Sequence, residues 1–382
     1  MRRRSFISGL VGVAGVGLGS VSGSAAAAGQ AHRPAAGPRE FAGPPRDWQA
    51  VPAPDGTPAA HLIDVAAAGA DLAWAVGEEG RNGSTGGVPL GLMWDGSSWS
   101  RVDLGHLPFA GGYLHSVAAT SAGSAYAIAT SGGTHLLRWD GTTWQEVDFP
   151  GRGQSGTSLT GIASDPVGGI WLSGRNSDGS VLLYGDGSGD YSGWQWISAP
   201  PSTTAATPTG VRVGPAGDVW VFAVEFVGRW DGVRWTELPA PGGIRATISD
   251  LLPVTDHDIW LTGHAYGVGG PPGKPPGATL LHGDGTSWQS VTPPFTVGML
   301  TGITADDLGG PDRIAGWDFW DQTRAHYLRW DGTAWVSERG PVSSSPVVMN
   351  SLVRVPGTAT DYWAVGTTSS YPYPPAQIRI ER

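Results

Sequence analysis

The chain has 382 residues, including 61 Gly and 31 Pro, and carries a formal net charge of −10 at pH 7. It contains no Cys, which excludes disulfides, thiolate metal sites and a Cys nucleophile. Because binding to nucleic acid requires a basic surface, the acidic balance also argues against nucleic acid as a partner.

The first 28 residues predict an export signal. Arg3-Arg4-Ser5-Phe6-Ile7 resembles the twin-arginine motif, and a Gly-rich apolar stretch and residues 25–28, all Ala, follow it. We expect cleavage near Ala28 and a secreted, extracellular protein that is not inserted in a membrane, because the apolar stretch is short for a spanning helix. Residues 29–45 are predicted to be a disordered lead-in to a folded domain over residues 46–382.

Two sequence phrases alternate from residue 62 to the end of the chain. The first is Leu-x-x-Val followed by a loop and an apolar run, as in residues 62–77, and it occurs seven times. The apolar run contains Trp in five copies, whereas Tyr126 and Ile314 replace it in the other two. The second reads LLRWDGTTWQEV at residues 136–147 and occurs six times. A repeat of roughly 45–50 residues indicates one supersecondary unit built again and again.

Each repeat contains four short runs rich in Val, Ile, Leu and Trp, separated by Gly, Pro, Asp and Ser. Such runs predict strands, and the Asp-Gly between the third and fourth runs predicts a hairpin turn. Four strands per repeat are typical of a β-propeller. We therefore predict an all-β, seven-bladed β-propeller of four-stranded antiparallel blades.

The seventh repeat lacks a fourth strand in its own part of the sequence. The chain ends at residues 376–382 with what reads as a third strand, while DWQAV at residues 47–51 matches the Trp-x-x-Val of the fourth runs. We expect residues 46–52 to complete the last blade and to close the ring, which leaves only short, protected edges.

The WDG phrase resembles the end of a WD-repeat blade and also the Asp-box of sialidases, although its Asp and Gly are adjacent here. Over nearly the whole mature chain, the repeat is similar to propellers found among secreted actinobacterial proteins. This resemblance implies the propeller fold, and most members of that group have no assigned activity. It therefore specifies the blade and not a reaction.

An Asp stands at the hairpin between the third and fourth strands of six repeats. We predict that each accepts hydrogen bonds from the backbone of its own turn. The alternative is calcium binding, but calcium needs six to eight converging oxygens and one Asp per blade does not supply them. We expect neither a metal nor a cofactor. The residues are Asp95, Asp140, Asp186, Asp231, Asp284 and Asp331.

Sixteen of the 19 Trp residues recur at equivalent positions, so we expect them to pack between blades. Trp196, Trp317 and Trp320 have no counterpart in other repeats. Trp317 and Trp320 are predicted to lie between the second and third strands of blade six. Loops of that class open on the same face as the blade-to-blade connections, here called the top face, and insertions on one face of a repeat protein often mark its binding face.

The aromatic residues in the top loops fall on blades five, six and seven. We predict a ligand-binding aromatic sector there, with Asp318, Asp321 and His326 as nearby hydrogen-bonding groups. Aromatic rings beside carboxylates suit sugar rings or apolar peptide side chains, whereas the alternative is that the rings pack the loops onto the propeller. The predicted binding residues are His264, Tyr266, Trp317, Phe319, Trp320, Tyr371 and Tyr373.

Catalytic motifs are scarce in this chain. Asp318 and Asp321 are weak candidates for an acid and base pair, and we assign no catalytic residue. We expect a monomeric binding or scaffold module for an extracellular or cell-wall glycan. The alternatives are a glycan-cleaving hydrolase or lyase on the same face and a platform for an extracellular protein partner.

Overall fold

The computed structural model describes residues 45–82, 86–121, 123–187, 193–200, 207–224, 226–239, 246–266, 275–369 and 375–382. The predicted signal and nearly all of the lead-in lie outside these ranges, so the expectations about them remain predictions. The described residues all belong to one compact unit. Within the described residues, no helix has the length and apolar character that crossing a membrane demands.

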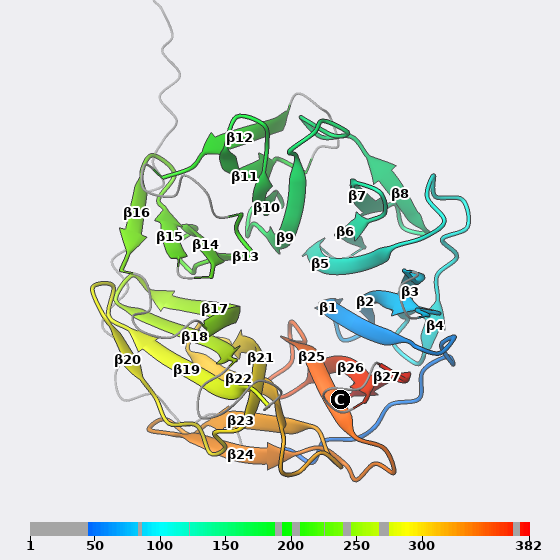
Figure 1. Cartoon of the computed structure of the whole chain (residues 1–382), viewed down its shortest axis with the longest axis vertical. Helices are drawn as coiled ribbons and strands as arrows, with labels where there is room; N and C mark the ends of the chain where they lie inside the picture. Colours follow the sequence, from blue (N-terminus) through cyan, green and yellow to red (C-terminus); the bar gives the residue numbers. More distant parts are fainter. Residues whose placement is uncertain are drawn as a thin grey trace, which may run out of the picture. The chain divides into compact units, whose positions relative to one another are not determined.

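Seven antiparallel sheets follow one another around a central axis (Figure 1), which confirms the seven-bladed β-propeller. Blades one to three consist of β1 (His61–Gly69), β2 (Leu72–Glu79), β3 (Val88–Trp94), β4 (Trp99–Arg101), β5 (Tyr113–Ser121), β6 (Ser124–Thr130), β7 (Thr134–Trp139), β8 (Trp144–Val147), β9 (Ser158–Ser164), β10 (Ile170–Arg175), β11 (Ser180–Gly185) and β12 (Trp194–Ser198). In each blade the strands pair in chain order, and the first strand lies nearest the axis.

The remaining blades repeat this order. They consist of β13 (Gly210–Val213), β14 (Val219–Ala223), β15 (Phe226–Trp230), β16 (Trp235–Leu238), β17 (Ala246–Thr255), β18 (Asp258–Ala265), β19 (Gly277–Gly283), β20 (Trp288–Ser290), β21 (Gly298–Ala305), β22 (Pro311–Asp318), β23 (His326–Trp330), β24 (Trp335–Arg339), β25 (Val347–Arg354), β26 (Tyr362–Thr368) and β27 (Gln377–Glu381). The last sheet, β25-β26-β27, has three strands of its own.

The N-terminal segment completes this last blade, as predicted. It runs beside β27 (Figure 1), where Ala50 pairs with Glu381 in antiparallel fashion. Gln49 and Arg382 exchange two backbone hydrogen bonds of 2.9 Å, and the Val51 amide donates to the Ile380 carbonyl at 3.0 Å. The two ends of the folded region therefore meet in one sheet, and the edge of β27 is covered.

The recurring Trp residues pack between neighbouring blades, which confirms their predicted role. Trp74 of blade one is fully buried and meets Trp139 and Trp144 of blade two at ring-centroid distances of 6.0 and 6.4 Å. Trp363 of blade seven likewise packs 4.7 Å from Trp94 of blade one. Because the rings of the first interface meet edge to face and those of the second are tilted, each interface combines burial of a large apolar area with favourable aromatic geometry.

The hairpin Asp residues bond to their own turns. The Asp140 Oδ1 accepts hydrogen bonds from the amides of Thr142 and Thr143 at 2.8 and 2.9 Å, and these bonds hold the pKa of its carboxyl well below the usual range. The described part of the chain contains no group of three or more metal-ligating side chains. The same pattern of two amide bonds occurs at Asp95, Asp231, Asp284 and Asp331.

Candidate functional site

The top-face loop of blade six connects β22 to β23, and the structure corrects the prediction for one of its Trp residues. Trp317 lies on β22, which extends through Asp318, and its side chain is 0% exposed. It pairs with Met299 of β21, so its ring points into the sheet packing rather than into a loop. Trp317 is therefore a core residue, and its ring offers no free face to a ligand.

Trp320 is the exposed aromatic residue of this loop, with a relative accessibility of 77%. The Asp318 Oδ1 accepts a hydrogen bond from the Trp320 amide at 3.0 Å, and the Phe319 amide donates to the Val297 carbonyl at 3.0 Å. The ring of Phe319 meets that of Trp320 at 4.9 Å and 81°. The loop is thus fixed at its base, while the indole remains in solvent.

The two carboxylates of the loop are engaged in holding it. Asp321 forms an ion pair with Arg339 at 3.1 Å, and a carboxylate oxygen of Asp318 lies 3.5 Å from the Nδ1 of His326. Burial, with a smaller contribution from Arg339, lowers the pKa of His326 to about 3, so its imidazole is neutral at neutral pH. These groups are brought together as predicted from the sequence, but as a support for the loop.

Blade five contributes a second aromatic pair on the same face. His264 lies on β18 and Tyr266 follows it, with ring centroids 5.0 Å apart at 88°. Tyr266 is 53% exposed, whereas burial lowers the pKa of His264. Of the other predicted binding residues, Tyr371 and Tyr373 lie outside the described residues. The structure therefore places exposed rings on two neighbouring blades.

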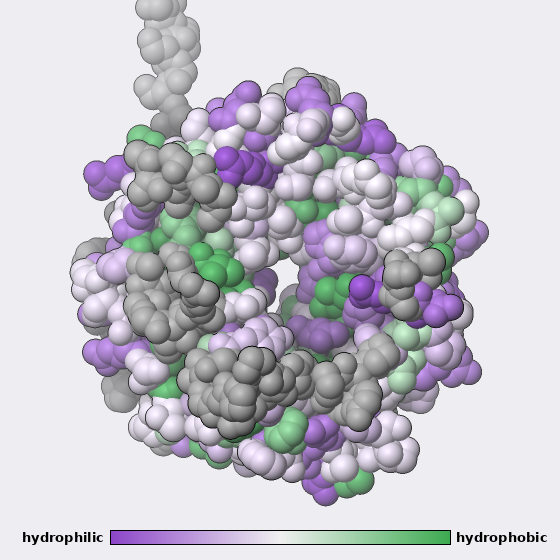
Figure 2. Space-filling view, viewed as in Figure 1, coloured by the Kyte–Doolittle hydropathy of each residue, from purple (hydrophilic) through white to green (hydrophobic). Residues whose placement is uncertain are grey.

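A channel runs along the axis of the ring and opens at its centre in Figure 2. Its upper part, toward the top face, has a volume of about 170 Å³ and is lined by the innermost strands of all seven blades. Most of the lining residues come from the two middle positions of the repeated Leu-x-x-Val phrase, such as Ser249 and Asp250 in blade five, and Arg212 follows the phrase in blade four. One short phrase of the repeat therefore builds the channel wall.

A charged network forms the waist of this channel, where its upper and lower parts meet. Arg212 donates two hydrogen bonds to Asp250, at 2.7 and 2.6 Å, and the other blades supply further donors. Asp64 accepts from the Val117 amide at 2.9 Å and from the Ser351 hydroxyl at 2.7 Å, while burial raises its pKa. This network was not predicted from the sequence. Its trace in the sequence is the third position of the Leu-x-x-Val phrase, which holds Asp64 and Asp250 in blades one and five but Ser or Gly in the other blades.

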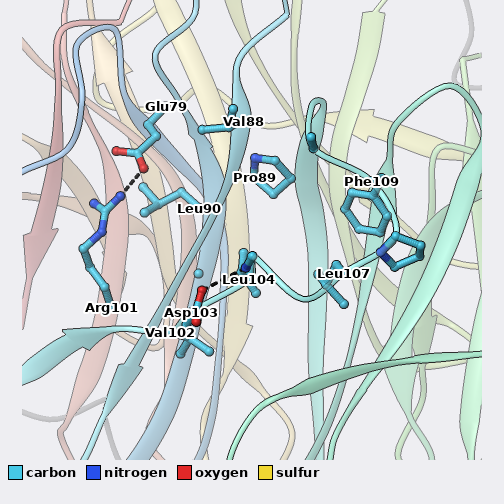
Figure 3. A pocket seen from close by; sticks show the side chains of 14 residues that line it. Glu79, Val88, Pro89, Leu90, Arg101, Val102, Asp103, Leu104, Leu107 and Phe109 are labelled. Atoms are coloured by element: carbon cyan, nitrogen blue, oxygen red, sulfur yellow. Dashed lines mark hydrogen bonds and ion pairs between the residues drawn. The ribbon is translucent and has the colours of Figure 1, made fainter.

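A separate groove lies between blades one and two, with a volume of about 650 Å³. Its walls are largely apolar, and the ion pair between Glu79 and Arg101 lies on the side opposite Phe109 (Figure 3). The groove exists because β4 has only three residues, so the start of β3, including Val88, pairs with β2 on its inner side and has no strand on its outer side. No sequence signal singled out this groove.

No family model and no curated protein matches the chain. Among solved structures, it is similar to YCF48 bound to D1 peptide, at 14% identity and a TM-score of 0.59 over 89% of this chain and 99% of that one. It is also similar to a catalytically inactive virginiamycin B lyase from Staphylococcus aureus with quinupristin, at 12% identity and a TM-score of 0.61 over 88% and 98%. At these identities the similarity shows a shared propeller fold.

Proposed function

We propose that this protein is a secreted binding module, exported by the twin-arginine route, that recognises a glycan on its top face through Trp320. The observation that carries the proposal is the 77% exposure of this indole on a loop held by hydrogen bonds at both Asp318 and Phe319. An isolated soluble protein gains nothing from keeping so large an apolar ring in water. A fixed loop also loses little conformational entropy when a ligand binds.

The surroundings of Trp320 suit a sugar ring. The flat indole offers an apolar surface for the C–H face of a pyranose, and the ion pair between Asp321 and Arg339 supplies acceptors and donors for hydroxyl groups. Tyr266 on the neighbouring blade is 53% exposed and provides a second ring for an extended glycan. Trp317 does not belong to this surface because it is buried.

Recognition of a polypeptide is the second candidate function. The groove between blades one and two favours it, because its apolar walls and the flanking Glu79–Arg101 pair suit a peptide side chain. The propeller YCF48, which was solved bound to a peptide, gives a precedent on the same fold. A glycan-cleaving activity has weaker support, since Asp318 and Asp321 already hold the loop.

The decisive experiment is a glycan array probed with the exported chain, residues 29–382, and with its Trp320→Ala variant. We expect binding to one glycan class and a loss of at least about tenfold in the variant, because an aromatic anchor commonly dominates such a contact. The matched control is Val233→Ala, which removes another exposed apolar side chain from a hairpin of the opposite face. Glycan binding that is unchanged in Trp320→Ala would refute this site. If no glycan on the array binds, glycan recognition is refuted and peptide ligands are the next to be tested.

A further inference from the structure

The upper part of the channel forms a chamber whose lining residues do not include Trp320. Its volume of about 170 Å³ would hold roughly five water molecules, at about 30 Å³ each, or one molecule the size of a single sugar ring. All seven innermost strands contribute to its wall, so its shape is fixed by closure of the ring rather than by a loop.

The side chains facing this chamber are mostly polar. One of them comes from the second position of each Leu-x-x-Val phrase, where blade one alone has an apolar residue, Ile63. The polar residues at this position are His115, Thr160, Thr209, Ser249, Thr301 and Asn350. An apolar residue would be expected if the channel were only a packed core.

Part of this hydrogen-bonding capacity is used between blades, and part faces the chamber. Thr301 donates to the Met349 carbonyl at 2.8 Å, and the Asn350 amide nitrogen donates to the Leu62 carbonyl at 2.7 Å. The hydroxyl of Ser249 and the imidazole of His115 also line the chamber, and the ring of His115 lies 5.5 Å from that of Tyr113. The amide oxygen of Asn350 also remains an acceptor.

The charged groups at the floor of the chamber are already engaged with one another or with neighbouring donors. Arg212 is bound to Asp250 through Nε and Nη2, and both oxygens of Asp64 already accept hydrogen bonds. An anion would meet two carboxylates, whereas a metal cation would meet a guanidinium and oxygens that are already engaged. Burial lowers the pKa of His115 to about 4, so its ring is neutral and offers one donor and one acceptor at neutral pH.

We propose that the upper channel binds one small, neutral polyhydroxylated molecule, a monosaccharide or a polyol, through Ser249, His115 and Asn350. A hydroxyl group both donates and accepts, and therefore matches a wall that presents a hydroxyl, an imidazole and an amide oxygen. This site is separate from the glycan surface at Trp320 and does not require it.

The test uses glucose, galactose and myo-inositol as probes in calorimetric titrations of the exported chain. A ligand of this size with a few hydrogen bonds is expected to bind with a Kd on the order of 1 mM. The blocking variant is Ser249→Ile, which should fold because blade one carries Ile63 at the equivalent position. We expect it to weaken binding at least about tenfold when compared in a Trp320→Ala background, in which the proposed glycan surface no longer contributes.

The matched control is Thr236→Ile, which places the same side chain on the exposed outer strand β16 and should not alter binding. A second measurement needs no variant, because bound ligand should shift the ring-proton NMR resonances of His115. Absence of saturable binding for all three probes, equal binding by Ser249→Ile, or a response to calcium or sodium chloride alone would each overturn the proposal.

Discussion

Two contacts between neighbouring blades are built from different kinds of side chain. One is the interface between blades one and two, and the other is the joint between blades six and seven. The first is built from Trp74, Trp139, Trp144 and aliphatic side chains. The second adds buried charges, since Arg313 and Glu338 are both at least nine-tenths buried. Successive repeats are adjacent in sequence, whereas the joint must bring the distant N-terminal strand into place.

Glu338 of β24 is the centre of this charged joint. Its carboxylate accepts hydrogen bonds from the Arg46 amide at 3.1 Å and the Trp48 indole at 3.3 Å, and it pairs with Arg313 at 3.2 Å. Trp48 also stacks on Tyr327 at 3.8 Å. Because hydrogen bonds are directional and apolar contacts are not, we infer that Glu338 fixes the register in which residues 46–52 close the ring.

The largest effect is expected at the apolar interface. Trp74→Ala should lower the free energy of unfolding by about 3–5 kcal/mol, because it removes a fully buried ring and leaves a cavity. Urea denaturation followed by Trp fluorescence measures this loss. A decrease in the free energy of unfolding of less than about 1 kcal/mol, the size expected for a surface substitution, would show that the Trp cluster does not stabilise the interface.

A slightly smaller effect is expected at the joint. Glu338→Gln keeps the shape of the side chain but removes the buried carboxylate that pairs with Arg329 and leaves Arg313 with Asp312 alone, at a cost of about 3 kcal/mol. Hydrogen exchange should report faster opening of residues 48–51 in this variant than in Trp74→Ala. Equal protection of that segment in the two variants would contradict the register-fixing role of Glu338.

The smallest effect concerns the pH dependence of the joint. Burial raises the pKa of Glu381, despite the opposing effects of Arg379 and of the Tyr327 hydroxyl. A carboxyl whose pKa is raised on folding favours the folded state below its unfolded pKa, and this contribution is lost as pH rises through the folded pKa. The wild type should therefore lose stability relative to Glu381→Gln as pH rises from about 4.5, the ordinary Glu pKa.

Denaturation midpoints of the two proteins across this pH range provide the measurement. The difference between them cancels the contribution of the hairpin Asp residues, whose pKa values are lowered and whose stabilisation is lost as the pH falls below about 3.9. A constant difference with pH would mean that Glu381 has the same pKa in the folded and unfolded chains.

The sequence alone determined the architecture because its signals are local and repeated. Short apolar runs, Asp-Gly turns and recurring Trp residues specify a blade, and their number specifies seven. The sequence also predicted how the ring closes, because the DWQAV segment around Trp48 has the pattern of a fourth strand. The exposed Trp320 was also predictable as a residue that the framework of the repeat does not use.

Only the tertiary structure decided which unusual residues reach solvent and which meet in the channel. Trp317 became part of the core because β22 continues through Asp318, and the length of a strand depends on its neighbours in the sheet. Asp64, Arg212 and Ser249 lie in three different blades, and their approach follows from closure of the whole ring. The local sequence pattern determines the structure of each repeat. Contacts between distant repeats form only once all seven blades are packed around one axis.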